Sequence, residues 1–272
     1  MKRWTRLILL LALLTALGLL AIGTASANSS AVWPTPGKNI KKNGKLEIDM
    51  SHTSDGYFMA GVSKKNKKRL KLRVVKGGQT LTYDLVGDTS FEVLPLQLGS
   101  GKYEVSLYEN VSGKKYAQEG KITLNVKLDR EDAAFLVPSQ YLPYSKSSAA
   151  VKDADKEMAR MSEKEAYEWV CDFMKTRFLY DFIKATKVKA GELPDIDGCY
   201  KTKMGVCQDL SAIMVCMLRT QGIPAKLMIG YADKQYHAWV EAEVRGEECF
   251  FDPTAALSAI SKVKVYTVER YY

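Results

Sequence analysis

Histidine is scarce in this chain, and cysteine is confined to its second half. His52 and His237 are the only histidines among 272 residues, and the first of the five cysteines is Cys171. The lack of an earlier cysteine excludes a lipoprotein-type anchor on an N-terminal cysteine. The chain also lacks a nucleic-acid recognition motif, so we expect no nucleic-acid partner for a protein that carries an export signal.

The export signal is at the start of the chain. A basic segment, an apolar run from Leu7 to Ile22 and the small residues Ala25-Ser26-Ala27 follow one another there. This order is typical of a secretory signal peptide, so residues 1–27 are predicted to be removed by cleavage after Ala27, giving a secreted or cell-envelope protein. An uncleaved N-terminal anchor is the alternative, although the run is shorter than the roughly 20 apolar residues of a comfortable membrane span.

Residues 28–44 are rich in Ser, Pro, Gly, Asn and Lys and are predicted to be a linker or tail. Residues 45–128 then show short segments in which apolar and polar residues alternate, separated by glycine-containing turns. The pattern predicts a small antiparallel β-sandwich-like accessory module. The predicted strands are 46–50, 70–74, 80–85, 103–108 and 122–128.

Positive charge is concentrated in this β module. The formal net charge of the chain is +9, and residues 28–128 hold 17 Lys and Arg against 9 Asp and Glu. Residues 129–272 hold 20 against 22. The most basic segment is Lys64-Lys65-Asn66-Lys67-Lys68-Arg69. A solvated strand connection explains it, and electrostatic binding to an anionic cell-envelope polymer or membrane surface is the alternative.

In the second half, a cysteine, a histidine and an aspartate occur in an order that suits nucleophilic catalysis. Cys207 precedes apolar residues at 210, 213, 214, 217 and 218, the spacing of one helical face, and Gly222 is a typical residue just beyond a helix end. Cys207 is therefore expected at a helix N-terminus, where unpaired amides and the helix dipole favour a thiolate and can stabilise an oxyanion.

His237 is expected to share a hairpin with Asp252. His237 opens an alternating strand, Arg245-Gly246 reads as a turn, and the returning strand ends at Asp252. With that turn centre His237 lies opposite Thr254, and Asp252 is its diagonal neighbour on the same face. Diagonal Cβ atoms are about 7 Å apart, within reach of a carboxylate–imidazole hydrogen bond. Each residue alone has an ordinary structural explanation, but the three together favour catalysis.

Five motifs in this region resemble the signature of the transglutaminase-like superfamily, in the form of an exported bacterial member. They are Gly205-Val206-Cys207-Gln208-Asp209, Leu218-Arg219-Thr220-Gln221-Gly222-Ile223-Pro224-Ala225, Gly230-Tyr231, His237-Ala238-Trp239-Val240-Glu241 and Asp252-Pro253-Thr254. The resemblance implies a papain-like α+β catalytic domain, assigned to residues 129–272. Many members carry a Trp shortly before the Asp-Pro-Thr, where this chain has Glu247-Glu248-Cys249-Phe250-Phe251.

The resemblance also implies an activity. Cys207, His237 and Asp252 would act on an amide or peptide carbonyl through a thioester, as a peptidase or amidase or in transglutaminase-type acyl transfer. Tyr180, Gln208 and Trp239 are candidates for oxyanion or substrate contacts. The expected partner is a protein or peptide substrate, with no cofactor. The alternative is a non-catalytic cell-surface binding or scaffold protein with this fold.

Other residues of the second half are predicted to be structural. Ser162-Glu163-Lys164-Glu165 matches a capping box before a helix that packs by its aromatic face, which places Trp169 in the core. Cys171, Cys216 and Cys249 are expected in the core, and pairing among the four cysteines other than Cys207 stays open. Asp195 and Asp197 lack the further oxygen ligands of a calcium loop, so no metal site is expected.

Overall fold

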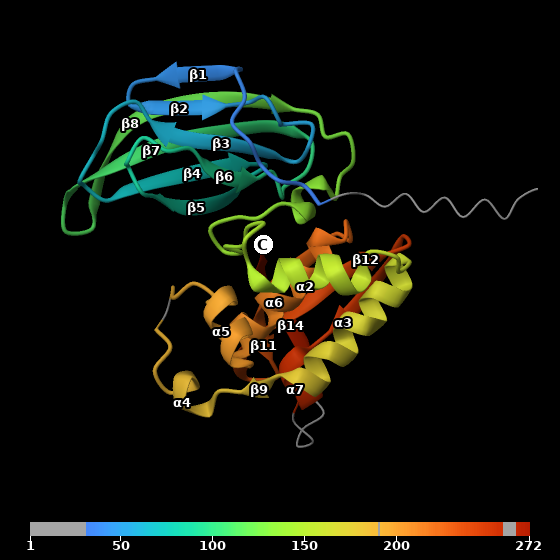
Figure 1. Cartoon of the computed structure of the whole chain (residues 1–272). Helices are drawn as coiled ribbons and strands as arrows, with labels where there is room; N and C mark the ends of the chain where they lie inside the picture. The colour runs from blue at the N-terminus through green and yellow to red at the C-terminus, as the bar shows by residue number, and fades with distance from the viewer. Residues whose placement is uncertain (1–30, 190, 258–264) are drawn as a thin grey trace, which may run out of the picture.

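The chain forms a β-sandwich stacked on a mixed helix and sheet domain (Figure 1). The computed structural model describes residues 31–189, 191–257 and 265–272, so the predicted signal peptide lies outside the described residues. Among the described residues, no helix combines the length and the apolar composition that a bilayer span requires.

The N-terminal module is the antiparallel sandwich expected from the alternating segments. Two four-stranded sheets, in the orders β1-β2-β3-β6 and β5-β4-β7-β8, enclose one apolar core. The alternation of apolar and polar residues predicts such strands because one face of each strand packs on this core and the other faces water. The strands are β1 (Ile40–Asn43), β2 (Leu46–Asp49), β3 (Tyr57–Val62), β4 (Leu70–Lys76), β5 (Gln79–Leu85), β6 (Glu92–Pro95), β7 (Gly101–Ser112) and β8 (Lys115–Val126).

Three of these strands, β1, β3 and β6, are absent from the sequence-based prediction, and the first two are absent for clear reasons. β1 lies inside residues 28–44, the predicted tail, and its four residues Ile40–Asn43 are all exposed, so they show no apolar face. β3 was not predicted because all six of its residues are buried. A strand covered on both faces has no polar alternation to read.

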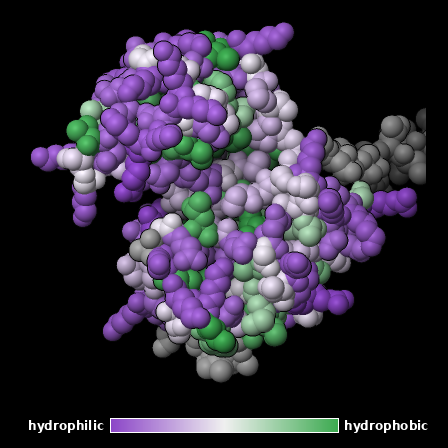
Figure 2. All heavy atoms as spheres, turned by 60° about the vertical axis from the view of Figure 1, so that its left-hand side comes forward, coloured by the Kyte–Doolittle hydropathy of each residue, from purple (hydrophilic) through white to green (hydrophobic). Residues whose placement is uncertain are grey.

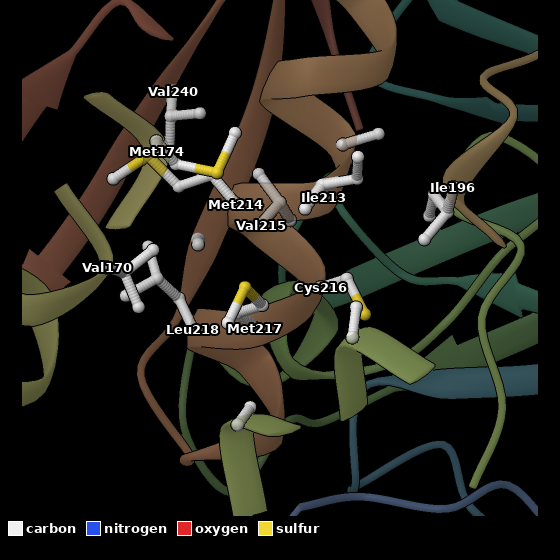
Figure 3. Close-up of a cluster of buried hydrophobic side chains, with 14 of the residues drawn as sticks. Val170, Met174, Ile196, Ile213, Met214, Val215, Cys216, Met217, Leu218 and Val240 are labelled. Carbon is white, nitrogen blue, oxygen red and sulfur yellow. The ribbon is translucent and has the colours of Figure 1, made fainter. Parts of the chain in front are cut away.

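The C-terminal domain is built around one buried helix. In α6 (Cys207–Thr220), every residue from Asp209 onward is buried. Figure 3 shows Met214, Met217 and Leu218 of this helix among Val170 and Val240 from its neighbours. Helix α6 contacts α2 (Ala149–Met158), α3 (Glu163–Arg177), α5 (Ile196–Thr202), β11 (Ala225–Ala232) and β12 (Gln235–Val244).

The sheet beside α6 is antiparallel, in the order β13-β12-β11-β14. Its alternate β12 residues Ala238, Val240, Ala242 and Val244 belong to the core that α6 enters. The remaining elements are η1 (Ala133–Leu136), β9 (Leu179–Tyr180), α4 (Phe182–Ala185), β10 (Met204–Gly205), β13 (Glu247–Phe251), α7 (Pro253–Leu257) and β14 (Tyr266–Tyr271).

The helix ends carry the predicted local signals. Ser162 Oγ accepts a hydrogen bond from the Glu165 amide at 3.4 Å, and Glu165 Oε2 accepts one from the Ser162 amide at 2.8 Å, which is the predicted capping box of α3. Gly222 has a φ of 72° beyond the end of α6, a left-handed conformation that glycine adopts without Cβ strain.

A buried arginine joins segments that are far apart in the chain. Arg219 is 1% exposed, and its guanidinium donates to the carbonyl oxygens of Ala225 at 2.8 Å, Val137 at 2.5 Å and Tyr272 at 3.0 Å. The segment leaving the β module, the end of α6 and the end of β14 are thereby held together.

Candidate active site

Cys207 is the first residue of α6 and is only partly buried. The N–H groups in the first turn of a helix have no acceptor within the helix, and their dipoles favour a negative charge. All five cysteines, Cys171, Cys199, Cys207, Cys216 and Cys249, are free thiols, so the structure has no disulfide between them. Cys171 and Cys216 are buried, as their predicted core positions require.

The hairpin of β12 and β13 has the predicted register. Val244 pairs with Glu247 around the turn, and Val240 pairs with Phe251. Arg245 and Gly246 both have positive φ, at 56° and 81°, as a two-residue turn of the primed type requires. The predicted turn centre is therefore confirmed, and Asp252 follows directly after β13.

This register brings His237 and Asp252 into contact, although the ladder ends at Val240–Phe251. Thr254 lies in α7, so the predicted position of Thr254 opposite His237 in the hairpin is wrong. The imidazole Nε2 lies 2.8 Å from Asp252 Oδ2, and the side chains are 11% and 3% exposed. Because Nε2–H donates to the carboxylate, Nδ1 is the ring nitrogen left for the Cys207 thiol. The hydrogen bond to Cys207 contributes to the His237 pKa, which places the thiol within reach of the imidazole.

The electrostatics favour a charged imidazole. Burial lowers the pKa of His237, but hydrogen bonds with Asp252 and Cys207 raise it more, to about 9. Burial also raises the pKa of Asp252, yet the hydrogen bond and charge of His237 leave it below its ordinary value. Near neutral pH the imidazole is therefore protonated, and a protonated imidazole stabilises a neighbouring thiolate.

Tyr266 of β14 completes the environment of Asp252, and sequence reasoning missed it. Its hydroxyl donates to Asp252 Oδ2 at 2.8 Å, while the Ala255 amide donates to Oδ1 at 3.0 Å. The ring of Tyr266 also packs edge-on against Trp239, with centroids 5.0 Å apart. Nothing in the sequence distinguishes Tyr266 from the other 14 tyrosines.

A second missed feature is the charge pair inside the N-terminus of α6. Asp209 is fully buried, and its carboxylate accepts from the Val206 amide at 3.0 Å and the Asp195 amide at 2.9 Å. Lys184 of α4 neutralises it, with Nζ 2.7 Å from Oδ2. The pair fixes the backbone before Cys207 and connects it to α4. Asp209 is the last residue of the motif around Cys207, but Lys184 is 25 positions earlier in the chain. No local sequence pattern links the two residues.

The three further candidates lie in different surroundings. Tyr180 of β9 pairs with Gly205, two residues before the nucleophile, and its pKa is raised first by burial and then by the charge of Cys207. Gln208 directs its amide elsewhere, since Nε2 donates to the Glu192 carbonyl at 3.2 Å. Trp239 is 1% exposed and packs against Tyr266, the residue that donates to Asp252. Tyr180 is thus the one best placed to contact a reacting carbonyl.

Two other residues have structural surroundings. His52 lies in a turn of the β module, where Nδ1 is 2.9 Å from Asp55 Oδ2. Trp169 is half-buried and stacks on Phe173 at 4.8 Å. The part of the chain that the structure describes holds no group of three or more His, Cys, Asp or Glu side chains suited to a metal ion.

Comparison with known proteins finds one family model that matches part of the chain. Residues 150–253 match the model of the transglutaminase-like superfamily, and no curated protein matches the chain. Similar solved structures include a proposed cysteine protease from Cytophaga hutchinsonii, 17% identical over 79% of this chain and 83% of the other, with a TM-score of 0.39. A red sea bream transglutaminase is 12% identical, with a TM-score of 0.30. That match covers 77% of this chain and spans 49% of the fish enzyme.

Proposed function

Because residues 150–253 match the model of the transglutaminase-like superfamily, we propose that this protein is a cysteine enzyme acting on amide or peptide carbonyls. The observation that carries the proposal is the His237–Asp252 hydrogen bond of 2.8 Å, with Cys207 at the other side of the imidazole. This is the order of contacts that a thiolate, its base and the group orienting the base require.

In the proposed reaction, the Cys207 sulfur attacks the carbonyl carbon, and the oxyanion lies at the N-terminus of α6. His237 gives the proton it holds at Nδ1 to the leaving amine as the carbon–nitrogen bond breaks, and a thioester remains. Water or a second amine then attacks the thioester while His237 takes its proton, and the free thiol returns. Water gives a peptidase or amidase, and an amine gives a crosslinking enzyme. Asp252 holds the imidazole orientation throughout.

Thiol labelling tests the proposal without knowledge of the substrate. Iodoacetamide should modify Cys207 of the wild type faster than any other cysteine, because the pair with His237 favours the thiolate. His237→Ala should slow that modification at neutral pH at least tenfold, as followed by mass spectrometry of the Cys207 peptide.

The matched control is His52→Ala, which removes the only other histidine and also breaks an imidazole–carboxylate contact. It should leave the rate unchanged. Equal labelling of Cys207 in the wild type and in His237→Ala would contradict the proposed enzyme activity. It would favour the alternative of a non-catalytic binding or scaffold protein.

We also propose that the protein is exported through residues 1–27. The basic segment, a short apolar run and small residues before the expected cleavage point support this. N-terminal sequencing of the secreted protein should give Asn28, whereas a secreted chain that begins with Met1 would contradict cleavage.

The basic segment of the β module is proposed to bind an anionic envelope polymer. Lys64, Lys65 and Lys67 are exposed, whereas Lys68 pairs with the buried Glu109 at 2.6 Å. Binding of the protein to cell-wall material should weaken steeply with added salt, and changing these three lysines to Gln should reduce it. Binding that does not change with added salt would contradict electrostatic binding to an anionic polymer.

A further inference from the structure

Large apolar side chains are exposed in the segments on both sides of Cys207. Phe182 and Ile183 of α4 are 74% and 70% exposed, and Leu193 is 41% exposed. Figure 2 turns the left-hand side of Figure 1, where α4 lies, toward the viewer and shows hydrophobic residues at the surface of the lower domain. Scattered exposed apolar residues are ordinary, but these three belong to the segments that border one reactive thiol.

The backbone fixes both segments against the start of α6. On one side, β9 pairs with β10, and the Asp181 amide donates to the Gly205 carbonyl at 3.0 Å, two residues before Cys207. On the other side, Gln208 Nε2 donates to the Glu192 carbonyl at 3.2 Å. The segment of Phe182 and Ile183 is therefore joined to the chain just before the nucleophile, and the segment of Leu193 to the residue just after it.

The orientation of α4 explains why its apolar residues face outward. Asp181 Oδ1 accepts from the Lys184 amide at 2.8 Å and caps the turn, and Lys184 extends inward to Asp209 at 2.7 Å. Phe182 packs edge-on against Tyr180, with centroids 5.0 Å apart. Since Tyr180 pairs with Gly205, two residues before Cys207, the exposed ring of Phe182 extends an apolar surface from the strand pair that precedes the nucleophile.

We propose that Phe182, Ile183 and Leu193, named here the α4 surface, bind bulky apolar side chains of a polypeptide substrate on either side of the carbonyl that Cys207 attacks. The inference rests on the proposed function and gives it a substrate class. A polypeptide can reach the Cys207 thiol and the α4 surface at the same time, because residues i and i+2 of an extended chain lie about 7 Å apart on the same face. One chain can thus present a carbonyl to the thiol and a side chain to the α4 surface.

Two peptide affinity probes with the same thiol-reactive group test this substrate class. One carries Leu on both sides of the reactive position, and the other carries Ser. The wild type should react with the Leu probe about tenfold faster than with the Ser probe, because binding buries apolar area. The double variant Phe182→Ser/Ile183→Ser should lose that preference, with its urea unfolding midpoint measured alongside to show that it is folded.

The control is Val86→Ser/Val111→Ser, which removes two equally exposed apolar residues, at 66% and 64%, from the β module. It should keep the preference for the Leu probe. Equal rates with the two probes in the wild type, or an unchanged preference in the α4 variant, would overturn the inference. Iodoacetamide labelling that does not depend on His237 would instead reject the proposed function, and the inference would fall with it.

Discussion

His237 is subject to two opposing influences, and their balance sets its charge. Burial lowers its pKa, whereas Asp252 and Cys207 raise it, with a net result of about 9. A raised histidine pKa stabilises the fold fully below the unfolded value of about 6.5, and that contribution is lost as pH rises through 9. Loss of the same proton also removes the acid that the leaving amine needs.

Asp252→Asn should move the alkaline limit of activity to lower pH. The wild-type rate should fall as pH rises through about 9, where His237 loses its proton. Without the carboxylate, the strongest interaction that raises this pKa is absent, so the fall should begin at least one pH unit lower. The pH profile of amide turnover on a generic protein substrate such as casein measures this, because that reaction, unlike alkylation, needs the imidazolium as acid. An alkaline limb that is not shifted in Asp252→Asn would contradict the assigned role of Asp252.

Tyr266→Phe should weaken the site without unfolding the protein. It removes the 2.8 Å hydrogen bond to Asp252 Oδ2 but keeps the ring that packs on Trp239. Hydrogen bonds to charged groups contribute about 1.5–3 kcal/mol, so the unfolding free energy measured in urea should fall by about that amount. Tyr116→Phe on β8 is the control. An unchanged unfolding free energy in Tyr266→Phe would show that Asp252 needs no second donor.

At the scale of elements, what could be predicted depended on how local the interactions are. The β12–β13 hairpin was predictable in register, because two turn residues and strict alternation determine which residues face each other. Helix α6 was predictable from its apolar spacing and Gly222. Tyr266 and Lys184 were not, because each approaches the site from another element and only the tertiary fold brings it there.

Asp209→Ala should destabilise the N-terminus of α6 and the fold with it. The change leaves Lys184 without its carboxylate and the Val206 and Asp195 amides without an acceptor. Removing one partner of a buried ion pair typically costs about 3–5 kcal/mol of unfolding free energy. Urea unfolding measures the loss. Asp172→Ala, whose side chain is 76% exposed on α3, is the control and should cost less than about 1 kcal/mol. A loss that small for Asp209→Ala would contradict the role given to the pair.

At the scale of the whole molecule, the two domains are joined by specific polar and aromatic contacts. Gln97 of the sandwich donates to the Tyr271 carbonyl at 2.6 Å, and the Gln140 amide group donates to the Asp84 carbonyl at 2.7 Å. Tyr141 of the C-terminal domain packs against Tyr83 of the sandwich, with ring centroids 5.8 Å apart. Alternation and motifs predicted each domain, but none of these contacts has a local sequence signal, so the docking could not be predicted.

Arg219→Met should loosen this connection from inside the C-terminal domain. The buried guanidinium donates to three carbonyl oxygens, and Met would leave all three without that donor. Each unsatisfied buried group costs about 1–3 kcal/mol, so unfolding free energy should fall by at least about 3 kcal/mol. Arg177→Met, at the exposed end of α3, is the matched control. Similar urea midpoints for both variants would show that Arg219 is not a structural link.

The proposed catalysis depends most directly on the ionisation of His237, and a proton NMR titration of the two histidines measures it. Substitution of His52 by Gln identifies the signal of His237. We predict that His237 titrates near 9 in the wild type and at lower pH in Cys207→Ser, because the thiol contributes to the raised pKa. Titration of His237 near the unperturbed value of about 6.5, unchanged in Cys207→Ser, would contradict the thiolate–imidazolium pair.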